Sequence, residues 1–178
     1  MDKKQILALP SMPPGNPSYP FGPYRFVDRE YFVVIYESDP EAIRQAVPEP
    51  LDPDGTGRVF YEWIAMPDSS GFGSYSESGI VIPCVFNGES VNYTAQMYLN
   101  DEPPITADRE IWGFPKRWGQ PSLRVETDTL TGTLDYGGQC VAMGTMAYKH
   151  ENLYTDPVEC RKSLEMTQIN LKLLPFNS

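Results

Sequence analysis

The stretch RVFYEWIAMPDSSGFGSYSESGIVIPCVFNGESVNYTAQMYL, residues 58–99, decides the fold that we expect for this chain. It contains three runs rich in β-branched and aromatic residues, and these runs predict strands near 58–66, 79–86 and 92–99. Segments rich in Gly, Asp, Ser and Asn separate the runs and supply turns. Consecutive strands joined by such short connections favour antiparallel pairing.

Similar patterns continue on both sides of this stretch. Further strands are predicted at 31–36, 122–127, 130–136, 140–149 and 169–174. Within them, Thr131-Gly132 is interpreted as a bulge, and Tyr136-Gly137-Gly138 as a hairpin turn.

Two helices complete the predicted set of elements. The first begins after Ser38, which has capping-box spacing to Glu41, and ends before Pro48. The second occupies about 156–166 and is opened by Asp156-Pro157.

Many short strands with two helices predict a mainly β (α+β) protein, a closed or nearly closed antiparallel β-barrel with a few outer helices. The 178 residues suit a single domain, 1–178. Residues 1–23 are expected to form an extended N-terminal arm, because 8–23 is dense in Pro and Gly.

The composition excludes several classes of function. Acidic residues outnumber basic ones 24 to 14, which argues against a nucleic-acid partner. No apolar run approaches the roughly 20 residues of a membrane-spanning helix, and no secretion signal is visible, so we expect a cytoplasmic protein. The single histidine, His150, and three widely spaced cysteines form no metal-binding pattern, and no cofactor motif occurs.

The most unusual window is EIWGFPKRWG, residues 110–119, where Trp112, Phe114 and Trp118 surround Lys116. Aromatic walls would desolvate the ammonium and lower its pKa, and the like charge of Arg117 would lower it further. A lysine activated in this way is a nucleophile for ketones. The alternative is a surface lysine whose stem lies along aromatic rings, and the local sequence does not separate the two.

Carboxylates occur in two other windows. Alternation along the strand places Glu62 with Phe60 and Ile64 on an apolar face, where an ionisable group is costly unless it is paired or functional. Glu77 follows the Gly-rich turn and is expected to point toward the same barrel mouth. Arg29 is a candidate partner for these carboxylates, or else a solvated arginine ahead of a strand.

Taken together, these windows resemble the acetoacetate decarboxylase family. The matching stretches are GPYRFVDREYFVVIY (22–36), AVPEPL (46–51), MPDSSGFGSYSESG (66–79), MYLNDEPP (97–104), REIWGFPKRWG (109–119), DTLTGTLDYG (128–137) and MGTMAYKH (143–150). They occur in the family's order and cover nearly the whole chain from about residue 20.

The resemblance implies that Lys116 forms a Schiff base with a small β-keto acid, and that decarboxylation of acetoacetate yields acetone and carbon dioxide without a cofactor. Lysine activation in this enzyme is itself a standard example of the principle. By motif match, Arg29 places the substrate carboxylate, while Glu62 and Glu77 orient groups or move protons. The resemblance also implies a homo-oligomer.

Two departures from the family pattern stand out. Arg117 occupies the place of a second lysine, which keeps the positive charge. Family chains also continue for some tens of residues beyond this one, so that C-terminal strands are expected to be missing. The alternatives are a Schiff-base aldolase or dehydratase acting on a pyruvate-like acid, and a non-catalytic barrel that binds a small acid.

Overall fold

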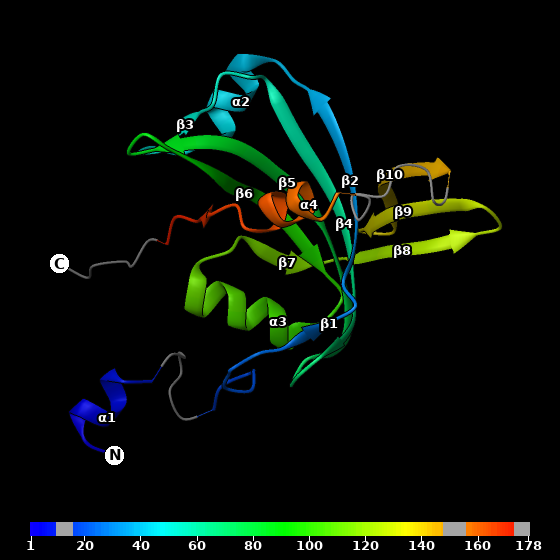
Figure 1. The fold of residues 1–178 in the computed structure, drawn as a ribbon. Helices are drawn as coiled ribbons and strands as arrows, with labels where there is room; N and C mark the ends of the chain where they lie inside the picture. The colour runs from blue at the N-terminus through cyan, green and yellow to red at the C-terminus, as the bar shows by residue number, and fades with distance from the viewer. Residues whose placement is uncertain (10–15, 148–155, 173–178) are drawn as a thin grey trace.

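The computed structural model describes residues 1–9, 16–147 and 156–172, and this part of the chain is mainly β with a few helices (Figure 1). The strands of the larger sheet are β1 (Phe26–Val27), β2 (Glu30–Glu37), β3 (Asp52–Pro53), β4 (Arg58–Ser69), β5 (Gly73–Phe86), β6 (Glu89–Leu99), β7 (Lys116–Trp118) and β11 (Gln168–Ile169). The smaller sheet contains β8 (Gln120–Glu126), β9 (Thr129–Tyr136) and β10 (Gln139–Ala147).

The three strands predicted within residues 58–99 form the centre of the larger sheet. β4 pairs with β5, and β5 pairs with β6, both antiparallel, as the short connections indicated. β2 and β1 pair with the outer edge of β4, while β7 and β11 pair in parallel with β6. The long central strands curve strongly, and α3 (Glu102–Ala107) lies under the sheet beside β7 (Figure 1).

The first predicted helix is confirmed as α2 (Pro40–Ala46), but its N-cap is Asp39, not Ser38. The Asp39 carboxylate accepts hydrogen bonds from the backbone N–H groups of Glu41 and Ala42. An aspartate cap also places negative charge at the positive end of the helix dipole. The capping-box interpretation was therefore wrong: the N-cap lies one residue later, and Ala42 at N3 has no side chain that could complete a box.

Four other helical elements occur in the described part of the chain. The helix predicted at 156–166 is confirmed as α4 (Pro157–Leu164). The prediction of an extended arm is wrong for α1 (Lys3–Leu7), where Asp2 and Gln5 form a capping box, and residues 10–15 lie outside the described part. α3 and the π-helix η1 (Asp108–Trp112) were not predicted.

The smaller sheet packs on the larger one through Trp63, which lies in a cluster with Phe32 and Leu130. A Cβ on Gly132 would come within 2.4 Å of the Trp63 ring, and one on Gly144 within 2.8 Å. The predicted bulge at Thr131-Gly132 is wrong, because β9 keeps its register there; the irregularity lies in β10, after Cys140. The glycine makes room for the indole ring.

The ends of the smaller sheet and of the chain were predicted in part. The hairpin turn is confirmed, since Gly137 and Gly138 both have positive φ between β9 and β10. Of the strand predicted at 169–174, only β11 is present in the described residues, and 173–174 lie outside them. His150 and the last two residues of the strand predicted at 140–149 also lie outside. No helix of the described part is long and apolar enough to span a membrane.

Candidate active site

A single row of paired residues across the larger sheet carries the candidate site. The register places Val33 opposite Glu62, Glu62 opposite Gly79, Gly79 opposite Met97, and Met97 opposite Lys116. Residues directly opposite in neighbouring strands project from the same face of a sheet. Four strands therefore direct Glu62 and Lys116 to one face, although 54 positions of sequence separate them.

The next row places Glu77 on the same face. Glu77 pairs with Ile64 on β4 and with Leu99 on β6, and it lies two residues from Gly79. Gly79, in the first row, lies where the backbone of β6 approaches too closely for any side chain. A Cβ there would lie 2.1 Å from the Gln96 carbonyl oxygen and 2.8 Å from the Met97 sulfur.

Lys116 is the centre of this site. The residue is only 6% exposed, and its Nζ lies 2.8 Å from Oε1 of Glu77 and 2.6 Å from Oδ2 of Asp108. The Phe114 ring lies 5.4 Å from Nζ. One buried cation thus contacts two carboxylates, from β5 and from η1.

The connection from η1 to β7 brings Asp108 and Lys116 together. Gly113 ends the π-helix in the left-handed conformation, with φ of 76°. The backbone N–H groups of Gly113 and Phe114 both donate to the Asp108 carbonyl oxygen, and Arg109 donates from Nη1 to the Lys116 carbonyl at 2.9 Å. These hydrogen bonds hold residues 108–116 in a tight turn, and the turn places the side chains of Asp108 and Lys116 next to each other.

The electrostatic state of Lys116 differs from the sequence-based expectation. Burial disfavours the charged amine and by itself lowers the pKa, but the charges and hydrogen bonds of Glu77 and Asp108 outweigh it and raise the pKa above the ordinary 10.5. The expected lowering is therefore not present in this ligand-free site, because two carboxylates hold the ammonium form.

Arg117 and the two tryptophans lie differently from the arrangement we expected. Arg117 is exposed, and its guanidinium lies over the Tyr98 ring, 5.7 Å from the ring centroid. It is not among the groups that shift the pKa of Lys116. Trp112 and Trp118 are 46% and 52% exposed, whereas Phe114, from the same window, has its ring 5.4 Å from Nζ.

Glu62 is buried enough to change its acidity. Desolvation, together with the negative charge of Glu77, raises the pKa of Glu62 to about 7. Glu62 makes no ion pair with Lys116 in the described part of the chain, so it lies in the row of the site as a separate carboxyl group.

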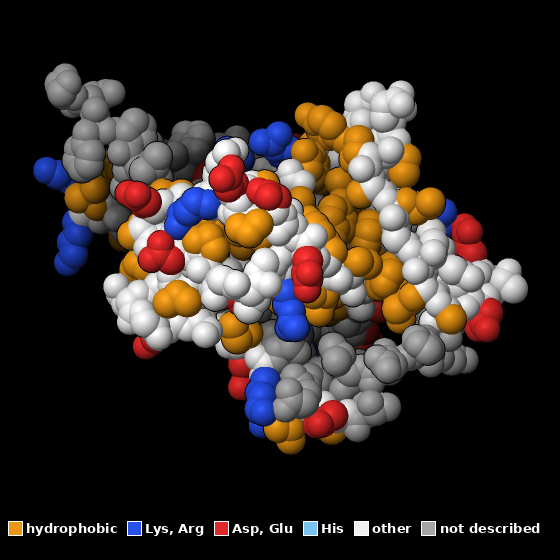
Figure 2. Space-filling model, turned by 90° about the horizontal axis from the view of Figure 1, so that it is seen from above, with side chains coloured by type: hydrophobic (Ala, Val, Ile, Leu, Met, Phe, Trp, Pro, Cys, Tyr) orange, Lys and Arg blue, Asp and Glu red, His pale blue; other side chains and the backbone are white. Residues whose placement is uncertain are grey.

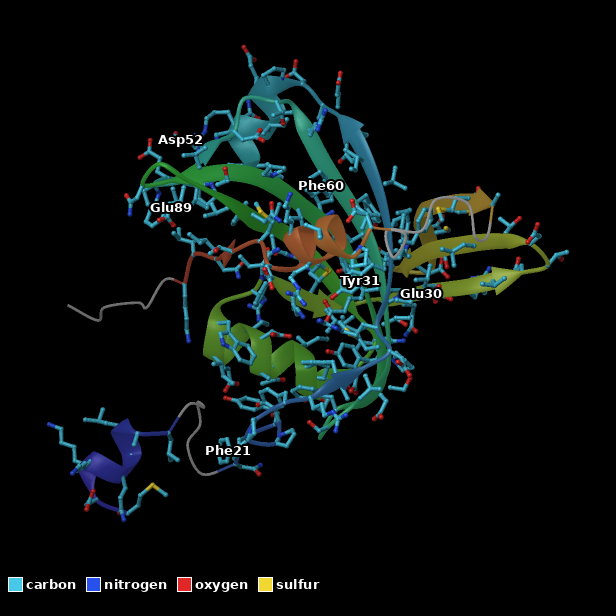
Figure 3. All side chains as sticks on the ribbon, viewed as in Figure 1. Phe21, Glu30, Tyr31, Asp52, Phe60 and Glu89 are labelled. Carbon is cyan, nitrogen blue, oxygen red and sulfur yellow. The ribbon has the colours of Figure 1, made fainter. Side chains whose placement is uncertain are left out.

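Two tyrosines border the carboxylates. The hydroxyl of Tyr75, which is buried, bonds to Glu77; burial, followed by the charges of Glu77 and Asp108, raises its pKa. Tyr31 of β2 pairs with Ile64, and burial raises the pKa of its hydroxyl, with Arg29, Glu77 and Glu62 close enough to contribute. Figure 3 labels Tyr31 and its neighbour Glu30 at the edge of the sheet.

Arg29 lies at the exposed border of the site. Its guanidinium lies 5.4 Å from the Phe26 ring centroid and 5.5 Å from that of Tyr31. The positive charge of Arg29 opposes part of the rise in the pKa of Tyr75, so the Arg29 guanidinium lies on the site face. The structure thus brings Lys116 and Glu77 into contact, with Glu62 and Arg29 nearby.

Asp108 is the site residue that the sequence reasoning missed. Glu62 carries an alternation signal, because it lies on a strand with apolar neighbours at every second position, and Glu77 was indicated by its position after a Gly-rich segment and just before an apolar strand. Asp108 lies in the π-helix η1, where side chains do not alternate between two faces, so the two-residue pattern of apolar residues gives no indication of its position. No cluster of His, Cys, Asp and Glu able to hold a metal ion occurs among the described residues.

Comparison with known proteins gives matches to one family. Residues 8–177 match the profile of the family described as acetoacetate decarboxylase (ADC). The acetoacetate decarboxylase of Bordetella avium is 54% identical over 165 residues, which are 93% of this chain and 66% of that protein. The acetoacetate decarboxylase of Paraburkholderia phytofirmans is 50% identical over 176 residues, which are 98% of this chain and 69% of that protein.

Solved structures give the same result. A structure of acetoacetate decarboxylase superposes with a TM-score of 0.90 at 44% identity, covering 99% of this chain and 71% of the other. The enzyme from Legionella pneumophila gives 0.84 at 42% identity, covering 90% and 63%. A β-sheet protein with a buried lysine beside carboxylates is thereby placed in a family: the chain belongs to the acetoacetate decarboxylase family. It spans about two thirds of the length of these relatives.

Proposed function

We propose that this chain decarboxylates acetoacetate to acetone and carbon dioxide through a Schiff base on Lys116. The observation that carries the proposal is the buried Nζ of Lys116, held between the carboxylates of Glu77 and Asp108. Proteins named acetoacetate decarboxylase are 54% and 50% identical to this chain over nearly its whole length, which supports acetoacetate as the substrate.

The chemistry needs an amine and an electron sink. The neutral amine of Lys116 attacks the ketone carbon of acetoacetate, and loss of water leaves a protonated imine. The C–C bond to the carboxylate then breaks, and its electron pair moves into the imine to give an enamine and carbon dioxide. Protonation of the enamine carbon and hydrolysis of the imine release acetone and restore the amine.

Each of the other site residues has a separate proposed role. We propose that Arg29, at the exposed border, attracts the substrate carboxylate. Glu77 orients the amine through its 2.8 Å contact. Glu62, whose pKa lies at about 7, exchanges the proton that the enamine carbon takes up.

A product assay with matched variants tests the proposal. The chain is incubated with acetoacetate labelled with ¹³C at the carboxyl carbon. NMR follows two products: carbon dioxide, which carries the label, and acetone, which does not. We expect both products with the unmutated chain and with Arg117→Met, and neither above background with Lys116→Met. A folded unmutated chain that releases no carbon dioxide would refute the decarboxylase proposal. An imine that forms without decarboxylation would favour an aldolase or dehydratase.

We also propose that the chain assembles into a homo-oligomer and that its curved sheet belongs to a closed or nearly closed barrel. Exposed apolar side chains support assembly: on β2, Val33 and Ile35 project from the face that carries the site and Val34 from the opposite face, and β10 exposes Val141 and Met143. Figure 2 shows apolar side chains gathered in a broad band on one face. Light scattering should give a multiple of the chain mass for the unmutated chain and a smaller mass for Ile35→Lys.

The compartment we propose is the cytoplasm. Cys84 and Cys140 both carry free thiols, and they belong to different sheets. Unpaired cysteines fit a reducing compartment.

A further inference from the structure

The segment that follows β11 lies beside the 109–115 segment, which leads into β7 (Figure 1). β5 occupies one edge of β6, so β7 and β11 share the other edge, and both run parallel to β6. β11 pairs Ile169 with Tyr93, whereas β7 begins with Lys116 opposite Met97. A parallel strand advances about 3.3 Å per residue, so the chain after Ile169 runs along β6 toward the start of β7.

Hydrogen bonds fix the start of this C-terminal segment on β6. The backbone N–H of Asn92 donates to the Thr167 carbonyl oxygen at 2.8 Å. The hydroxyl of Thr94 donates to the side-chain oxygen of Gln168 at 3.4 Å. The C-terminal segment is therefore anchored on the same strand against which β7 pairs.

Lys172 contacts the 109–115 segment directly. Its Nζ donates a hydrogen bond to the carbonyl oxygen of Glu110, a residue 62 positions away in the sequence. A Cβ placed on Gly113 would lie 2.8 Å from the Cβ of Lys172, so these two residues pack with no space for another side chain. Lys172 thus holds the segment by one polar contact and by close packing.

The Glu110 carbonyl needs a donor from outside its own segment. In a π-helix a carbonyl accepts from the N–H five residues later, and that residue is here Pro115, which has no N–H. The N–H four residues later belongs to Phe114, and it donates to the Asp108 carbonyl at 3.1 Å instead. Lys172 supplies the donor that the local backbone lacks, as lysines do for the last carbonyls of many helices.

We propose that Lys172 is a positioning residue for the reaction at Lys116: it holds the 109–115 segment and thereby fixes where the amine is presented. The inference rests on the proposed function, since it assumes that Lys116 is the covalent amine. Asp108 and Lys116 flank the segment and contact each other at 2.6 Å, so a displacement of the segment disturbs both. Catalysis by a covalent amine depends on its geometry, and a misplacement of about 1 Å costs about 10²-fold in rate.

Hydrogen exchange measures whether Lys172 holds the segment. Mass spectrometry follows a peptide that spans 109–116 in three variants: Lys172→Met, which removes the donor, Lys172→Arg, which keeps one, and the control Lys4→Met, which changes an exposed lysine on α1. We expect faster exchange of this peptide in Lys172→Met alone, with unchanged exchange in β5 and β9. Unchanged exchange of the peptide in Lys172→Met would overturn the inference.

Steady-state decarboxylation of acetoacetate separates positioning from substrate binding. For Lys172→Met we expect kcat to fall about tenfold while KM stays within about twofold of the unmutated value, because the amine is misplaced but the substrate contacts remain. Lys172→Arg should recover most of kcat, and Lys4→Met should match the unmutated chain. An unchanged kcat, or a raised KM alone, would overturn the inference.

Folding and the proposed function are checked separately. Urea unfolding followed by circular dichroism gives the folded fraction of Lys172→Met under the assay conditions, and kcat is corrected for it. A loss of kcat that disappears after this correction would overturn the inference. If the unmutated chain releases no carbon dioxide, the proposed function fails; if it does and Lys172→Met is equally active, only the inference fails.

Discussion

Replacing Lys116 by methionine should destabilise the protein through the charges it leaves behind. The side chain is 8% exposed and contacts two carboxylates at 2.6 and 2.8 Å. At an effective dielectric constant of about 20, each contact is a gross attraction of about 6 kcal/mol, much of it offset by desolvation. Methionine fills a similar volume but leaves Glu77 and Asp108 buried together without a cation.

The expected loss is about 3 to 5 kcal/mol of unfolding free energy at mildly alkaline pH, the usual cost of breaking a buried ion pair. The sign of the pH dependence follows from linkage. In the absence of the cation, burial and the charge of Glu77 raise the folded-state pKa of Asp108 unopposed, so the native state binds more protons and loses stability as pH rises. The deficit should therefore shrink at mildly acidic pH.

Urea unfolding followed by circular dichroism measures this deficit at both pH values. Arg117→Met is the matched control, because it removes the adjacent, exposed cation. We expect the control to stay within about 0.5 kcal/mol of the unmutated chain. A Lys116→Met variant as stable as the unmutated chain at alkaline pH, or one that becomes more stable as pH rises, would refute the buried triad of charges.

Three further predictions concern the surroundings of the lysine. Gly79→Ala should cost about 1 to 3 kcal/mol in urea unfolding, because the added methyl group meets the Gln96 carbonyl and Met97; an unchanged midpoint would contradict the close approach. Glu62 holds a proton up to a pKa of about 7, compared with its ordinary 4.5, so unfolding free energy should fall as pH rises between these values. Glu62→Gln should remove that slope, and a slope that persists would show that other groups cause it. Arg109→Gln should lower kcat about tenfold with little change in KM, because the bond to the Lys116 carbonyl positions the amine; steady-state kinetics would instead show a raised KM alone if Arg109 acts on binding.

The central sheet was predictable because its signal is local. Strands 58–66, 79–86 and 92–99 follow from residue type and turns, and alternation placed Glu62 on the site face. Glu77 follows from its position at the start of an apolar strand. The site as a set of paired rows, however, depends on register across four strands, which no single window carries.

Other features depended on tertiary contacts that the sequence does not display. Gly132 was interpreted as a bulge, whereas the Trp63 ring requires the space. The aromatic residues near Lys116 in sequence were expected to enclose it, yet Trp112 and Trp118 point largely to solvent. Asp108 stood eight residues from Lys116 in a segment without periodicity, and only the turn after η1 brings the two side chains together.

The account rests on Lys116 as the covalent amine, and peptide mapping of a trapped intermediate tests that most directly. The chain is reduced with borohydride in the presence of acetoacetate and then digested, and the modified peptide is sequenced by mass spectrometry. We expect one adduct on Lys116 with the mass of a reduced acetone imine, which records loss of carbon dioxide before trapping. An adduct on another lysine, or none in a folded chain, would contradict the account.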